Sequence, residues 1–265
     1  MIPLREQEAI RVRFEQELEG RVRVDFFTQK PLKVVLPGRE ECAFCEDVRK
    51  LLREIAGLSE RVALTVRDFA EEREAASRLG VDRVPGIVIR GVLNRPVRFF
   101  GIPAVRLFPV FIETIIAASR SAPVVSPPAS RTLRKARRDV EVTVLAAPPC
   151  PHSAPVAFAA ARLGLASPRV RASIVEVSEF PSLIERHQIH AVPTTIVDGR
   201  IVIVGAIDEE ALAEAIADAS AGEPSPLAPA SHRHAGPATP FQPPQPHEQS
   251  PAARRTVSGL ILPGR

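Results

Sequence analysis

The sequence contains no tryptophan and no tyrosine, and it has only one methionine and three cysteines in 265 residues. Phenylalanine, with 12 copies, is therefore the only aromatic residue that can contribute to a core. No apolar run reaches the roughly 20 residues that a membrane-spanning helix needs, so we expect no membrane partner. The opening segment MIPLREQEAIRVRFEQ also lacks the apolar stretch of a secretion signal, and a cytoplasmic protein is expected.

A strong excess of one charge is also missing. The formal net charge is +4, and arginines are interleaved with Glu and Asp along the chain except between Arg131 and Arg138. A nucleic-acid-binding surface would need a more concentrated basic patch. The sequence therefore predicts a mildly basic, solvated surface and no nucleic-acid partner.

The few cysteines fall in two short motifs, CAFC at 42–45 and CPHS at 150–153. None is left over for a structural disulfide, and an odd number is atypical of a secreted disulfide scaffold. Two cysteines could form half of a zinc site, but the sequence offers no further pair of ligands at a suitable spacing, so no metal is predicted. The pattern favours thiol–disulfide exchange in a reducing compartment.

The two motifs belong to an internal repeat. Pro85 follows Cys42 by 43 residues, and Pro193 follows Cys150 by the same interval. Around each proline the two copies match at an offset of 108 residues, as in Val81 with Ile189, Val84 with Val192, Val88 with Ile196 and Gly91 with Gly199. Gly101 matches Gly205 best, at an offset of 104, which predicts an insertion at the turn of a hairpin in the first copy.

Hydrophobic periodicity predicts the same order of elements in both copies. The first copy is expected to contain a helix at 4–18 with Leu4, Ile10, Phe14 and Leu18 on one side, a strand at 21–27, a further extended piece at 32–38, a helix at 46–58, a strand at 61–69, a helix at 71–80, a hairpin at 84–92 and 96–101, and a helix at 104–119. The second copy is expected to contain a strand at 141–147, a helix at 155–165, a strand at 171–179, a helix at 180–189, a hairpin at 192–200 and 202–205, and a helix at 208–220.

This order predicts an α/β fold, with two tandem domains that each have a mixed central sheet flanked by helices. The predicted domains are 1–122, with the CAFC dithiol, and 123–221, with the CPHS monothiol. A Pro-rich hinge and a short basic helix, SAPVVSPPAS and RTLRKARRD, join them. Residues 222–265, rich in Pro, Ala, Ser and His, are predicted to be a disordered tail.

With a CxxC motif at a helix start and a Val-Pro pair before a hairpin, each half resembles a thioredoxin or glutaredoxin fold. Residues 4–220 as a whole resemble the tandem protein disulfide oxidoreductase family, which is glutaredoxin-like. The resemblance implies a redox-active disulfide, and it implies cis peptide bonds before Pro85 and Pro193. The backbone of Val84 or Val192 would then pair with an extended substrate peptide beside the active sulfur.

The positions of the two cysteines in CAFC predict different chemical roles for them. Cys42, before the first turn of its helix, lies where unpaired backbone N–H groups favour a thiolate, so it is the predicted nucleophile. Cys45, which is expected one turn into the helix and less exposed, would attack the resulting mixed disulfide and release the reduced substrate. Phe44 is expected to be a partly exposed cap on the site. The charged neighbours act on the thiol pKa in opposite directions: it is raised by Glu41, Glu46 and Asp47 and lowered by Arg39 and Arg49. The sequence therefore leaves the direction of exchange open.

The second motif departs from the family pattern, because Ser153 stands where a resolving cysteine is expected. Cys150 then has three alternatives: a monothiol assisted by protonated His152, a vestigial cysteine in a domain used for binding or packing, or a ligand of an iron–sulfur cluster with glutathione. Pro151 and His152 differ from the CGFS motif that such clusters favour.

Two functions of different class follow from the sequence. The first is a thiol–disulfide oxidoreductase that uses Cys42 and Cys45 on protein or small-molecule disulfides. It would need no bound cofactor, with glutathione as a possible co-substrate, and it would depend on an external reductase or glutathione. The second is a tandem module that binds extended peptides along its Val-Pro loops without catalysis.

Overall fold

The protein is described by a computed structural model that covers residues 2–29, 42–222 and 231–241. The first half contains α1 (Leu4–Glu17), β1 (Val22–Thr28), α2 (Cys45–Ala56), β2 (Val62–Asp68), α3 (Arg73–Leu79), β3 (Gly86–Arg90), β4 (Val97–Phe100) and α4 (Leu107–Ala118). This is the order that the sequence predicts. The extended piece expected at 32–38 lies outside the described residues.

The second half repeats the order. It contains α5 (Pro127–Leu133), β5 (Val140–Ala146), α6 (Ser153–Ala166), β6 (Val170–Glu176), the 3₁₀ turn η1 (Val177–Glu179), α7 (Pro181–His187), β7 (Ala191–Val192), β8 (Thr194–Val197), β9 (Ile201–Val204) and α8 (Glu209–Ala221). In the first half β1 pairs in parallel with β2 and antiparallel with β3, and β3 forms an antiparallel hairpin with β4. In the second half β5, β6, β8 and β9 pair in the same way.

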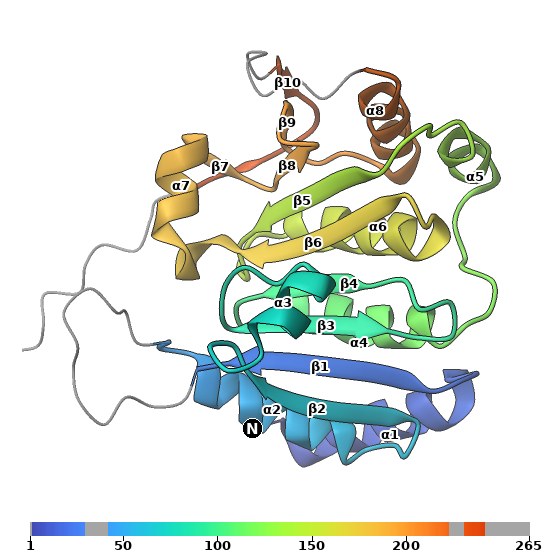
Figure 1. Cartoon of the computed structure of the whole chain (residues 1–265), viewed down its shortest axis with the longest axis vertical. Helices are drawn as coiled ribbons and strands as arrows, with labels where there is room; N and C mark the ends of the chain where they lie inside the picture. The colour runs from blue at the N-terminus through green and yellow to red at the C-terminus, as the bar shows by residue number, and fades with distance from the viewer. Residues whose placement is uncertain (1, 30–41, 223–230, 242–265) are drawn as a thin grey trace, which may run out of the picture.

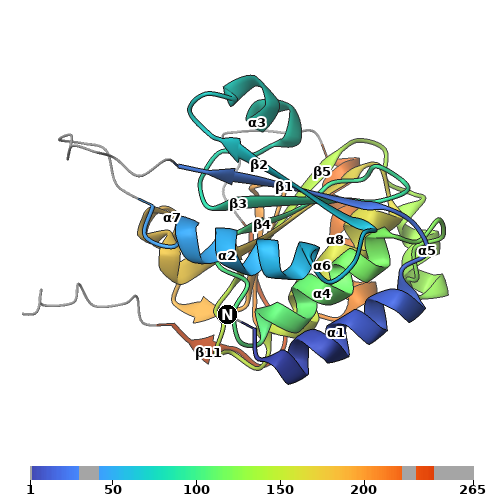
Figure 2. The ribbon, with the colours of Figure 1, turned by 90° about the horizontal axis from the view of Figure 1, so that it is seen from below.

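One nine-stranded sheet runs through the molecule in the order β10-β9-β8-β5-β6-β4-β3-β1-β2 (Figure 1). Figure 2 shows α1, α2 and α4 on one face of the sheet and α3 on the other. Two buried apolar clusters correspond to these faces. The larger lies among α1, α2, α4, α6 and α8, and the smaller includes Leu79 of α3 and Leu183 of α7. The fold is therefore mixed α/β with helices on both faces, as the sequence predicts.

The hairpins explain the change of offset between the copies. The register pairs Ile89 with Val97 in one half and Val197 with Ile201 in the other, so the first hairpin has the longer turn. Gly101 and Gly205 then occupy equivalent positions, with φ of 88° and 99°. Their N–H groups donate to the carbonyls of Pro85 and Pro193, at 3.0 and 2.8 Å. The insertion falls at the hairpin turn, where the sequence places it.

The two halves share a sheet because β4 pairs in parallel with β6, with Arg98 opposite Ser173 and Phe100 opposite Val175. Just beyond this ladder the Ile102 N–H donates to Oε1 of Glu179, at 2.6 Å. Arg83 stacks over the rings of Phe100 and Phe180, so it contacts one aromatic ring from each half. Backbone, carboxylate and cation–π contacts thus hold the halves together at a single seam.

Three local expectations are corrected. Leu4 is 83% exposed, because α1 buries only its Ile10 and Phe14 side. The predicted basic helix instead begins earlier, at Pro127, since Ser126 caps the helix by accepting the Ala129 N–H and proline suits the first helical turn. Cys45 is the first residue of α2 and does not lie one turn inside it.

Residues 231–241 differ from the prediction of a disordered tail. They form β10 (Ser231–His234), which pairs in parallel with β9, and β11 (Thr239–Pro240), which pairs antiparallel with β7. The rest of the predicted tail, 223–230 and 242–265, lies outside the described residues. Among the described helices, none is both long and apolar enough to cross a bilayer.

The seam generates a pH-dependent prediction through Glu179. Burial raises the pKa of Glu179 to about 7; the hydrogen bond from the Ile102 N–H opposes this rise, and the negative charge of Glu176 adds to it. A carboxyl whose pKa is raised by folding destabilises the fold as pH rises from its unfolded value to its folded one. The unmodified protein should therefore lose unfolding free energy between pH 5 and pH 8. We expect this decrease to be smaller by about 1–3 kcal/mol in Glu179→Gln.

Denaturant unfolding at several pH values measures this effect. Glu185→Gln, at an exposed position on α7, is the control and should follow the unmodified protein. Parallel stability curves for Glu179→Gln and the unmodified protein would contradict the prediction.

Candidate active site

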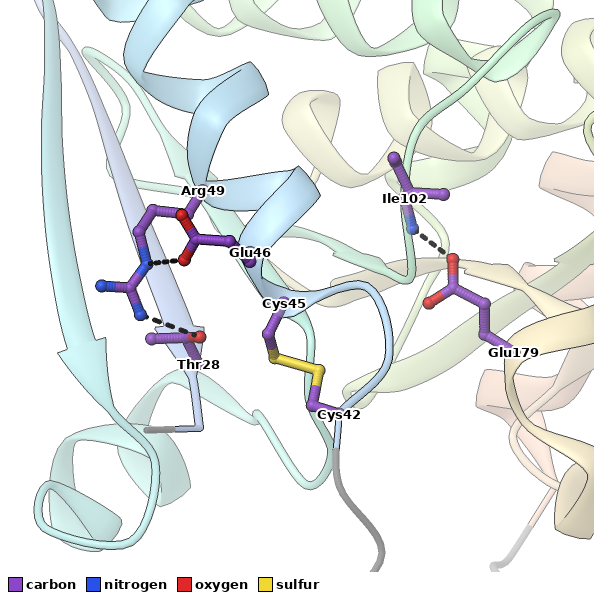
Figure 3. The surroundings of a disulfide bond; sticks show 7 residues. All are labelled: Thr28, Cys42, Cys45, Glu46, Arg49, Ile102 and Glu179. Atoms are coloured by element: carbon purple, nitrogen blue, oxygen red, sulfur yellow. Dashed lines mark hydrogen bonds and ion pairs between the residues drawn. A yellow bond between two sulfur atoms is a disulfide. The ribbon is translucent and has the colours of Figure 1, made fainter. Parts of the chain in front are cut away.

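Cys42 and Cys45 form a disulfide at the N-terminus of α2 (Figure 3). The two sulfurs are 2.05 Å apart and the two Cα atoms 5.5 Å apart. Cys45 begins the helix and is 4% exposed, whereas Cys42 lies before it and is half-buried. Cys42 is therefore the sulfur that an external thiol reaches more easily. Phe44, between them, is 40% exposed, which agrees with a partly exposed cap.

The charges around the disulfide are partly paired. Nε of Arg49 lies 3.4 Å from a carboxylate oxygen of Glu46, and another guanidinium nitrogen donates to the Thr28 hydroxyl at 3.5 Å. Both contacts are visible in Figure 3. Arg49 is thus turned toward Glu46 and β1, so its positive charge is offset by a neighbouring carboxylate. Glu41 and Arg39, the other predicted neighbours, lie outside the described residues.

An apolar groove of about 730 Å³ lies beside the motif. Phe44 and Leu51 of the α2 region form one wall, and the segment from Ile102 to Phe108 forms another. Val105, in that segment, is 69% exposed and has φ of 50°, a left-handed conformation that is unusual for a β-branched residue. The sequence alone does not indicate this groove, because its walls come from segments far apart in the chain.

The Val-Pro pairs lead into β3 in the first half and into β8 in the second. The Val84–Pro85 and Val192–Pro193 peptide bonds are both cis. In the second half the thiol of Cys150 lies against this loop, with Sγ 3.4 Å from the Val192 carbonyl oxygen. The structure therefore brings together the second cysteine and the second Val-Pro pair, as the duplicated spacing predicts.

Cys150 is much less accessible than Cys42, since it is only 2% exposed. Ser153 is fully buried beside it, and its hydroxyl accepts the Ala147 N–H at 3.4 Å. The Thr239 hydroxyl of β11 lies 3.2 Å from Sγ of Cys150. Nothing in the sequence pointed to Thr239, because it reaches the thiol only through the pairing of β11 with β7.

The second thiol has a perturbed acidity. Burial raises the pKa of Cys150, but hydrogen bonds from the Ser153 and Thr239 hydroxyls and from the His152 and Ser153 backbone outweigh it, so the pKa falls below its ordinary value. The contribution of His152 comes from its backbone and not from a protonated imidazole, which the motif predicts. Within the described ranges, no group of three or more His, Cys, Asp or Glu side chains is arranged to hold a metal ion.

Comparison with known proteins supports the fold. A family model of the thioredoxin domain matches residues 140–217. A protein disulfide oxidoreductase from Aeropyrum pernix K1 is 21% identical over 84% of this chain and 95% of its own, with a TM-score of 0.72. The NTD_N/C domain of the alkylhydroperoxide reductase AhpF from Enterococcus faecalis is 19% identical over 82% of this chain and 100% of its own, with a TM-score of 0.71. No curated protein sequence matches.

These similarities, at under 25% identity, establish a thioredoxin-type fold. They extend over most of this chain and nearly all of both solved structures, so the likeness is not confined to one half. The family match covers the second half, the one without a CxxC pair. The departure at Ser153 has therefore left the surrounding fold recognisable.

The equivalence of the two motifs predicts that Ser153→Cys creates a second disulfide, with Cys150. The corresponding Cys42 and Cys45 have a Cα–Cα distance of 5.5 Å, which lies within the range that disulfides require. In a Cys42→Ser, Cys45→Ser background, mild oxidation should remove both remaining thiols. Thiol titration and peptide mapping measure the result, with Ser153→Ala as the control that keeps its single thiol. Two persistent thiols in Ser153→Cys would show that the motifs are not equivalent.

Proposed function

We propose that the protein is a thiol–disulfide oxidoreductase whose redox centre is the Cys42–Cys45 pair. The observation that carries this proposal is a disulfide at a helix N-terminus with one half-buried and one buried sulfur, in a thioredoxin-type fold. Such a dithiol can cycle between its reduced and oxidised forms without opening the core.

In the reductive direction the cycle begins with both cysteines as thiols. The Cys42 thiolate attacks a substrate disulfide, forms a mixed disulfide and displaces one substrate thiolate. The Cys45 thiolate then attacks the Cys42 sulfur and releases the second substrate thiolate, leaving the Cys42–Cys45 disulfide. An external dithiol protein or glutathione supplies the two electrons that restore the dithiol. Run in reverse, the same steps oxidise a substrate dithiol.

The substrate class that fits this centre is a disulfide in an extended segment of a protein. The backbone of Val84, next to cis Pro85, would pair with such a segment beside Cys42. Phe44 and the adjacent apolar groove would contact the flanking side chains. No bound cofactor is needed for these steps, and a reducing compartment such as the cytoplasm would suit the reductive direction.

Substitution of each cysteine tests the proposal. Cys42→Ser should lose reduction of a protein disulfide such as that of insulin, because the accessible nucleophile is gone. Cys45→Ser should accumulate a mixed disulfide with the substrate, because no thiol remains to resolve it. Turnover and mass spectrometry of the trapped species are the measurements.

Cys150→Ser separates this proposal from its alternatives. Activity retained in Cys150→Ser and lost in Cys42→Ser assigns the chemistry to the first half. The opposite pattern would assign it to a monothiol at Cys150. Unchanged behaviour of all three variants, without turnover, would support a non-catalytic peptide-binding module.

The charges at the start of α2 generate a second prediction. Removing the carboxylate in Glu46→Gln takes a negative charge from beside the thiols and leaves the Arg49 guanidinium without this partner. Both changes stabilise the thiolate of the reduced form, so the midpoint potential should rise by on the order of 10 mV. Equilibration with glutathione or dithiothreitol buffers measures the potential. Glu60→Gln, an exposed position beyond the other end of α2, is the control of equal charge change; a lower potential in Glu46→Gln would contradict the prediction.

A further inference from the structure

The segment 235–241, called the strap here, lies along the second half beside Cys150. Its strand β11 is labelled in Figure 2. It pairs antiparallel with β7, with Thr239 opposite Val192 and Pro240 opposite Ala191. The Phe241 N–H donates to the His190 carbonyl at 2.8 Å. The strap therefore adds a strand to the backbone that immediately precedes cis Pro193.

The side chain of Thr239 completes this arrangement. Its hydroxyl oxygen lies 3.2 Å from Sγ of Cys150, which is also 3.4 Å from the Val192 carbonyl oxygen. An extended peptide that presents a cysteine to a thiol must place its sulfur at this kind of position, with its backbone held alongside. Thr239 carries a hydroxyl there, so the strap has the pose of a peptide ligand without the sulfur that would react.

The strap is seated by specific contacts along its length. The Ala235 N–H donates to the Val204 carbonyl, and the Gly236 N–H donates to the Ala206 carbonyl at 2.8 Å. The Ala206 N–H returns a bond to the Pro237 carbonyl at 2.9 Å. These bonds run between backbone groups and satisfy both sides of the contact.

Glycine is required where the strap approaches most closely. A Cβ on Gly205 would lie 2.2 Å from the Gly236 carbonyl oxygen, and Gly205 has a positive φ as well. At the other end of the strap, Phe241 packs against the apolar cluster that includes Cys150 and Val192. The strap is thus fitted to this surface at both ends.

The second half covers the first half through equivalent contacts. Ile102 is the equivalent of Ala206, and its N–H donates to Glu179 of the segment that follows β6. The strand pairing is also equivalent, because β4 forms a parallel ladder with β6 and β9 forms a parallel ladder with β10. The C-terminal segment thus covers the β9 edge of the second half, which is equivalent to the β4 edge of the first half that the second half covers (Figure 1).

We propose that the strap occupies the β7 edge beside Cys150 as a tethered ligand, at the place where the resemblance to thioredoxin folds already implies pairing with an extended peptide. The ligand class has a small hydroxyl or thiol residue opposite Val192 and an aromatic residue two positions later. While the strap is seated, Cys150 is closed to other strands. This inference concerns the second half and does not depend on the activity of Cys42 and Cys45.

A cross-linking experiment tests the position of Thr239. In the full chain with Cys42→Ser and Cys45→Ser, Thr239→Cys places a second thiol opposite Cys150. Diamide accepts the two electrons and two protons released when the two thiols form one disulfide. We expect this disulfide to form at least about tenfold faster than a disulfide in the same background with Ala235→Cys, because the seated strap holds position 239 against Cys150. On a freely moving tether, a thiol would have a similar effective concentration near Cys150 at either position. Equal rates for the two variants would overturn the proposal.

A protection experiment tests the closure in the otherwise unmodified chain. With the Cys42–Cys45 disulfide intact, Cys150 is the one remaining thiol of the three cysteines, and its reaction with N-ethylmaleimide can be followed by mass spectrometry. Gly236→Val combined with Phe241→Asp should accelerate the reaction at least about tenfold, because a Cβ on Gly236 would lie 2.8 Å from the Ala206 carbonyl oxygen and the apolar contact of Phe241 is lost. Ala235→Val, at an exposed neighbouring position, should leave the rate unchanged.

Adding the ligand separately distinguishes binding from simple coverage. A synthetic peptide with the sequence AGPATPFQP, residues 235–243, should slow the reaction of the Gly236→Val, Phe241→Asp chain in a saturable way. The same peptide with Asp in place of Phe is the control and should give no protection. Rapid reaction of the unmodified chain, or no effect of the peptide, would overturn the proposal.

Discussion

The hairpin edge of each four-stranded unit, formed by β4 in the first half and by β9 in the second, is the constraint on which the rest of the structure depends. The hairpins that end the two units leave β4 and β9 with unpaired backbone groups on one side, and an uncovered edge invites pairing with another chain. The first edge is covered by β6 of the second half, and the second by β10. Both covering strands pair in parallel, so β10 extends the sheet beyond β9 in the same way as β6 extends it beyond β4.

Much of the architecture could be predicted because it is encoded locally. The apolar spacing of Val48, Leu52 and Ile55 specifies the buried side of α2, and the slip between Gly101 and Gly205 locates the longer hairpin turn. The cysteine-to-proline interval likewise brings Cys150 to the Val192 carbonyl. These features depend on contacts within one half, where sequence periodicity and spacing are informative.

The contacts between segments could not be predicted in the same way. Strands β2 and β6 are equivalent in the repeat, yet β6 is almost wholly buried because it pairs on both sides, whereas β2 lies at the sheet edge and exposes Val66. The composition of residues 231–241 is polar and Pro-rich, so it carries no strand signal. Their pairing is decided by backbone groups that the second half leaves available, and side-chain patterns do not report such groups.

The two changes in the second half reinforce each other chemically. A mixed disulfide formed at Cys150 would have no neighbouring thiol to resolve it, because Ser153 occupies that position and a hydroxyl cannot attack a disulfide as a thiolate does. Hydrogen bonds also lower the pKa of Cys150, which would favour its reaction if it were exposed. With Cys150 only 2% exposed beside β11, the proposed seating of the strap would prevent such a dead-end product. The absence of a resolving cysteine and coverage by Thr239 therefore act in the same direction, and under the proposed function the first half is the site where exchange is completed.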